Sequence, residues 1–67
     1  MNNSRTPRIG DKVFILHPAY VAGNVGIVRS EEILSDGKPS GNWIIEVSSK
    51  DLVLSLADNE FKIIDKE

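Results

Sequence analysis

The chain has 67 residues, enough for one small domain and too few for a deep catalytic cleft. It has no cysteine, which excludes disulfides and thiolate metal ligands, and no apolar run approaches the ~20 residues that a membrane span needs. From Ile9 onward, six lysines and arginines stand against ten acidic residues, a net charge of −4. This charge argues against a dedicated nucleic-acid binder, because such binding depends on neutralising phosphates. We expect a soluble, cytoplasmic protein without a cofactor.

The first half of the chain predicts two strands joined by an unusual connector. Residues 1–8 are polar and are expected to form a flexible leader before a domain that spans residues 9–67. "GDKVFIL" (10–16) predicts the first strand, and "VGIVRS" (25–30) predicts the second, with Gly26 as the site of a bulge and "EEIL" either extending the strand or leading out of it. Between them lies "HPAYVAGN" (17–24), which combines a proline, a tyrosine and a glycine.

The second half predicts three further strands. They are "WIIEVS" (43–48), "LVLSL" (52–56) and "FKIID" (61–65), and they are preceded by a polar loop, "SDGKPSGN" (35–42). "SSKD" is expected to be a short turn, and "ADNE" (57–60) a single helical turn before the last strand.

Five short strands in a flat sheet would leave one apolar face in water, so we predict an all-β, small five-stranded barrel that hides this face and its edges. The alternation of apolar residues predicts a core of Val13, Ile15, Val25, Ile27, Trp43, Ile45, Val47, Leu52, Leu54, Phe61 and Ile63.

The order of these elements resembles that of SH3-like barrels. "RIGDKVFILHPAYVAGNVGIV" is similar to the start of one branch, which comprises the PsaE family of photosystem I, the variable chain of ferredoxin–thioredoxin reductase and the nitrile hydratase β-subunit. The residues that carry the resemblance are Gly10, Asp11, Val13, Pro18, Tyr20, Gly23, Gly26 and Val28. The final Gly-x-x-Gly-x-Val turn also resembles the KOW motif of ribosomal and transcription-factor barrels.

The resemblance implies an accessory or adaptor module that binds a larger protein complex of photosynthetic or redox type, on the cytoplasmic face of a photosynthetic membrane. The alternative is a KOW-type barrel bound to ribosome, RNA polymerase or RNA, and a third reading is a β-subunit fragment that supports a metalloenzyme. The partner complex and the oligomeric state stay open. If "LVLSL" lies at a sheet edge, it would be a site for self-association or strand addition.

The candidate partner-binding residues lie mainly in loops: His17, Pro18, Tyr20, Lys38 and Trp43. Tyr20 is either an interface anchor or a cap on the barrel end, two possibilities that the sequence leaves nearly even. Trp43 is either a core residue or a partner-binding aromatic, and its phase with Ile45 and Val47 favours the core. Gly10, Asp11, Gly23 and Gly26 are expected to be structural turn residues.

Neither catalysis nor a metal site is expected. His17 is the only histidine, so it lacks the partners that a triad or a zinc site requires. Glu31 and Glu32 are adjacent, so on a strand they point to opposite faces and cannot act as a carboxylate pair.

Overall fold

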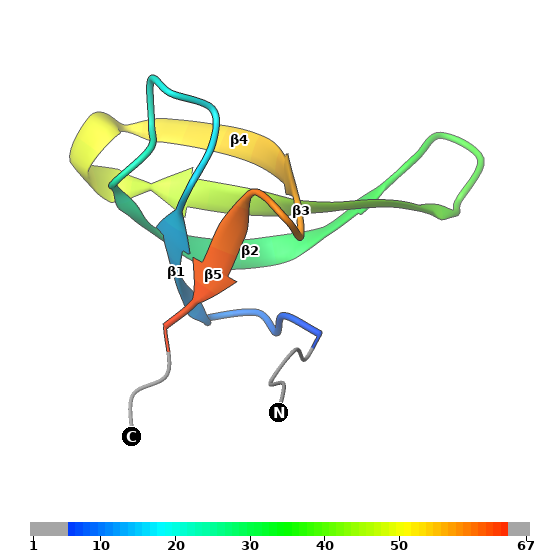
Figure 1. The fold of residues 1–67 in the computed structure, drawn as a ribbon. Coiled ribbons are helices and arrows are strands. Elements are labelled where there is room, and N and C mark those ends of the chain that lie inside the picture. Colours follow the sequence, from blue (N-terminus) through cyan, green and yellow to red (C-terminus); the bar gives the residue numbers. More distant parts are fainter. Residues whose placement is uncertain (1–5, 65–67) are drawn as a thin grey trace.

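The computed structural model describes residues 6–64, which form one antiparallel sheet of five strands and no α-helix (Figure 1). The elements are β1 (Lys12–Ile15), β2 (Val25–Ile33), β3 (Pro39–Val47), the 3-10 helix η1 (Ser48–Lys50), β4 (Leu52–Ala57) and β5 (Phe61–Ile63). The strand order is β4-β3-β2-β1-β5, so the chain forms a meander of four strands and then returns to pair β5 with β1. The predicted all-β class with five strands is confirmed.

The sheet is bent but not closed. The register of β2 against β3 shifts between Val28 and Ser30 and again between Glu31 and Ile33, and such bulges bend and twist a strand. In Figure 1, β1 and β5 consequently cross the direction in which β3 and β4 run. Within residues 6–64, β4 and β5 are not paired with each other, so the expected closed barrel without edges is not observed.

The second and third strands form a longer hairpin than the sequence predicts. β2 continues through "EEI" to Ile33, and β3 begins at Pro39 rather than at Trp43. The chain reverses over Leu34–Lys38, where the Leu34 N–H donates to the Lys38 carbonyl at 2.8 Å and Gly37 adopts a φ of 86°. Half of the predicted polar loop is therefore strand, because a turn centred on one glycine suffices to reverse the chain.

The helical turn lies one connection earlier than predicted. It is η1, between β3 and β4, and it ends at Asp51, which adopts a left-handed φ of 54°. Residues 57–60 instead form a tight turn in which the Glu60 N–H donates to the Ala57 carbonyl at 2.9 Å. The Glu60 carboxylate accepts the Ala57 N–H at 2.9 Å, which closes the turn without a helical segment.

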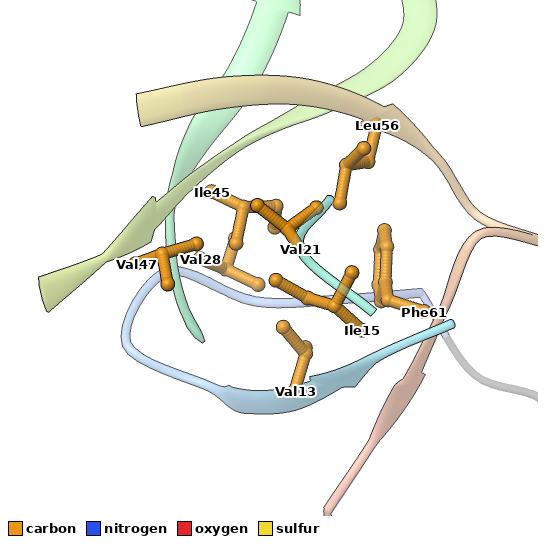
Figure 2. Packing of buried hydrophobic residues seen from close by; sticks show 8 residues of the cluster. All are labelled: Val13, Ile15, Val21, Val28, Ile45, Val47, Leu56 and Phe61. Carbon is orange, nitrogen blue, oxygen red and sulfur yellow. The ribbon is translucent and has the colours of Figure 1, made fainter. Parts of the chain in front are cut away.

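The core lies on one face of the bent sheet, as Figure 2 shows. Its buried members are Val13, Ile15, Val21, Val28, Ile45, Val47, Leu56 and Phe61. Four further predicted core residues are half-buried and pack against this cluster: Trp43, Leu52, Leu54 and Ile63. Three buried members were not predicted to belong to the core: Val21, Val28 and Leu56.

The sequence predicts that Val25 and Ile27 of β2 face the core, and this prediction is wrong. Val25 is exposed and Ile27 is half-buried, whereas Gly26 and Val28 face the core. The pairing of β1 with β2 decides which face of β2 is inward, because buried Val13 lies opposite Gly26 and residues opposite each other share a face. Gly26 is not the site of a bulge, since both register shifts lie further along β2.

The expected leader, residues 1–8, lies largely outside the described residues. Of the part that is described, Pro7 is buried, and the backbone N–H of Arg8 donates to the Asp11 carboxylate at 2.8 Å. Pro7 therefore packs with the domain, and Arg8 is bonded to the turn that leads into β1.

Candidate functional site

The connector, residues 17–24, is fastened to the sheet at its base. The Ile15 N–H donates to the Asn24 carbonyl at 2.9 Å, and the Gly23 N–H donates to the Ile15 carbonyl at 2.8 Å. On the β1 side, the N–H groups of Leu16 and His17 both donate to the Glu60 carbonyl, at 2.8 and 3.2 Å. The connector is thus tied both to itself and to the turn before β5.

Successive turns order the interior of the connector. The Val21 N–H donates to the Pro18 carbonyl at 3.1 Å, and the His17–Pro18 peptide bond is cis. The Val21 carbonyl accepts both the backbone N–H of Asn24 at 3.1 Å and its side-chain amide at 3.0 Å. Gly23 adopts a φ of 88°, a value that favours glycine and lets the chain turn into β2.

Two neighbouring residues of the connector point in opposite directions. Val21 has no exposed surface and lies among the core side chains of β1, β2 and β3 (Figure 2). Tyr20 keeps 66% of its surface exposed. Because Val21 supplies the apolar contact to the core, Tyr20 is not the cap on the end of the sheet that the sequence left as one of two possibilities.

Of the other four candidate partner-binding residues, two lie in the connector and two lie elsewhere in the fold. His17 is exposed and Pro18 is half-buried, and both lie in the same loop as Tyr20. Lys38 is exposed at the tip of the β2–β3 hairpin, which projects away from the body of the sheet (Figure 1). Trp43 is half-buried against the core, opposite Leu56 in β4.

Three of the four predicted turn residues lie in turns, and the fourth, Gly26, lies within β2. Gly10 adopts a φ of 94°, and the Asp11 N–H donates to the Arg8 carbonyl at 3.0 Å, so these residues form the turn into β1. Gly23 forms the turn into β2. Gly26 does not form a turn, and its task is packing, because a Cβ there would lie 2.5 Å from Cγ2 of buried Ile45.

An exposed apolar pair on the outer face of the sheet was missed by the sequence reading. Phe14 and Val25 lie opposite each other in the β1–β2 ladder and are 40% and 47% exposed. Lys62 of β5 lies opposite Phe14 on its other side. The signal was present in the alternation of β1, where Val13 and Ile15 face inward and Phe14 therefore faces outward.

Comparison with known proteins adds no relative: no family model, no curated protein and no solved structure matches this chain. Within residues 6–64, no three His, Cys, Asp or Glu side chains are grouped so that they could hold a metal ion. Over the same range, no helix has the length and apolar character needed to cross a bilayer.

Proposed function

We propose that this chain is a non-catalytic accessory module that docks on a larger protein through its connector, with Tyr20 as the anchor. The observation that carries the proposal is the contrast between Val21, which is fully buried, and Tyr20, which is 66% exposed on the same short loop. A loop that is already ordered loses less entropy when it binds. Tyrosine offers a large contact area with few rotatable bonds, which is why it is frequent among interface anchors.

We further propose that the bent sheet is of the SH3-like type. A four-strand antiparallel meander whose fifth strand returns to β1 supports this assignment, as does the bulged β2 at the centre of the sheet. The segment from Gly10 to Val28 resembles the entry of the PsaE family and its relatives. From that resemblance we take the partner to be a photosynthetic or redox complex, reached from the cytoplasmic side of its membrane.

The KOW-type alternative has less support. Its glycine turn is accounted for by backbone geometry at Gly23 and by core packing at Gly26. The described basic residues are spread over several elements, and Arg29 is paired with Glu46, its Nε lying 2.6 Å from Oε1. A phosphate-binding surface needs basic groups gathered on one face.

Affinity capture of the full chain under native conditions, followed by mass spectrometry, identifies the partner. We expect a protein complex whose recovery is insensitive to nuclease. Recovery of RNA, or of ribosome or polymerase components released by nuclease or by moderate salt, would support the KOW-type alternative instead.

Tyr20→Ala and Val21→Ala form the matched pair that tests the anchor. Tyr20→Ala should shift the melting temperature by no more than the few degrees that ~1 kcal/mol allows, and should weaken binding of the captured partner about tenfold or more. Val21→Ala should lower the free energy of unfolding by about 1–3 kcal/mol, because it removes buried methyl groups. Both are measured by thermal unfolding and by titration with the partner.

Tyr20→Phe is the conservative control, since it keeps the ring and removes only the hydroxyl. It should bind more tightly than Tyr20→Ala. The docking role of the connector is wrong if Tyr20→Ala binds the partner as tightly as the unmodified chain.

A further inference from the structure

The two edges of the sheet differ in how they are protected. β5 has three residues, and the central one is the exposed Lys62, so this edge is short and charged. β4 has six residues, "LVLSLA", without a charge or a proline, and its register with β3 runs unbroken from Asn42↔Ala57 to Val47↔Leu52. Natural proteins usually protect an edge with charges, prolines, bulges or short strands, and β4 has none of these.

The backbone groups that β4 turns away from β3 can be identified. The N–H and C=O of Ala57 are bonded to Glu60, so they face away from β3. Because the direction alternates along an antiparallel ladder, the N–H and C=O of Val53 and Ser55 face the same way. Within residues 6–64, the outward N–H and C=O groups of Val53 and Ser55 make no hydrogen bond.

This edge is complementary to itself. In an antiparallel pair of two β4 strands centred on Leu54, Val53 of one chain lies opposite Ser55 of the other, and the reverse pair is equivalent. Each of these pairs joins residues whose N–H and C=O both face outward, so the two pairs can form four hydrogen bonds. A two-fold dimer requires this kind of self-complementary surface.

The side chains fit the same arrangement. Leu52 and Leu54 lie on the core side of β4 and are only half-buried in the single chain. In the centred register Leu54 would meet Leu54 of the second copy in a close pair, which would cover surface that now faces water. On the outer face, Val53 is 61% exposed and would lie diagonal to its own copy.

We propose that a second copy of this chain pairs with β4 along this edge, which joins the two sheets into one continuous sheet about a two-fold axis at Leu54. A single pair of edge strands buries little surface, so the dimer is reversible and its population rises with protein concentration. This contact does not involve the connector, so it stands or falls separately from the proposed docking by Tyr20.

Sedimentation velocity of the full chain between ~1 µM and ~1 mM tests the proposal, and should show a mass that rises from monomer toward dimer. Val53→Pro should raise the dissociation constant about tenfold or more, because it removes an outward N–H that β3 does not use. Val53→Thr keeps the N–H and a β-branched side chain, and it should dimerise like the unmodified chain.

A charge exchange tests the register and covers the case that Val53→Pro does not fold. Val53→Lys should be monomeric, because the two lysines would lie diagonally across the axis, and so should Val53→Glu. An equimolar mixture of the two should recover the dimer. A chain that stays monomeric up to ~1 mM would overturn the proposal. So would a dimer that the proline, lysine and glutamate substitutions all leave unchanged. Failure of the lysine and glutamate variants to associate when mixed would also overturn it. Pairing of β4 with a strand of the captured partner, seen as protection of β4 amides only in that complex, would also contradict it.

Discussion

Gly26 shows how one residue can set the spacing of two strands. It faces the core in β2, where a Cβ would lie 2.5 Å from Cγ2 of Ile45 and 3.1 Å from the carbonyl oxygen of Glu46. Ile45 has no exposed surface, and its β-branched side chain has little freedom at χ1, so it cannot easily move away. The absence of a side chain at Gly26 is therefore what lets β2 and β3 approach at this point.

Gly26→Ala should consequently lower the free energy of unfolding by about 1–3 kcal/mol, the usual cost of overpacking a core. For a domain of this size each kcal/mol corresponds to a loss of about 4–8 °C in melting temperature. Val25→Ala, at the exposed neighbour, should cost less than ~1 kcal/mol. Equal stability of Gly26→Ala and the unmodified chain would mean that the Ile45 side chain relaxes into other space.

The β2–β3 hairpin and β4 are linked by a polar network on the outer face. The Glu32 carboxylate accepts the hydroxyls of Ser40 at 2.7 Å and Ser55 at 3.0 Å. The Asn42 side-chain amide donates to the Ser55 hydroxyl at 3.1 Å. Strand alternation places Glu31 on the other face, opposite Trp43, so the two adjacent glutamates have separate surroundings.

Glu32→Ala should destabilise the hairpin by about 1–2 kcal/mol, because two hydroxyls lose a charged acceptor in a partly exposed setting. Glu31→Ala is the matched control, since the Glu31 side chain is exposed and makes no hydrogen bond or ion pair within residues 6–64. It should change stability by no more than ~0.5 kcal/mol. Chemical denaturation measures both, and amide exchange in β2 and β3 locates the effect. If the two variants are equally stable, the network contributes nothing.

At the scale of the whole molecule, the pairing of β1 with β5 connects the two ends of the described chain. Ile15 lies opposite Phe61 and Val13 lies opposite Ile63, and the Ile64 N–H donates to the Lys12 carbonyl at 2.8 Å. Phe61 is the only aromatic side chain among the buried residues of the described part. A chain of this length has a free energy of unfolding of about 3–10 kcal/mol at the usual value per residue.

Phe61→Ala should therefore remove a large part of this free energy of unfolding or unfold the protein, because removal of a buried phenylalanine costs about 3–5 kcal/mol. Lys62→Ala, at the exposed neighbouring position, should retain the wild-type fold. Circular dichroism and one-dimensional NMR distinguish the two outcomes. A Phe61→Ala variant as stable as the unmodified chain would show that the Phe61 side chain does not hold β5 in the sheet.

The sequence by itself determined the all-β class and the approximate positions of the five strands, because short runs of β-branched and apolar residues between turn residues typically form strands. It also determined the inward face of β1 and much of β3, where alternation is regular. It could not determine which residues of β2 face the core, since the apolar residues of this strand allow either face to be inward. The pairing of Val13 with Gly26 decides between the two faces.

Only the tertiary structure decided which side chains of the connector face the core and where β4 lies in the sheet. Val21 and Tyr20 are adjacent and both carry large apolar surface, and only the folded connector, with its hydrogen bonds from Val21 to Pro18 and from Asn24 to Val21, shows that Val21 is buried and Tyr20 exposed. The composition of "LVLSL" does not distinguish a central strand from an edge strand. It is an edge strand because β3 is its only neighbour in the described sheet. Strand pattern is a local property, whereas face and neighbour follow from contacts between residues distant in the sequence.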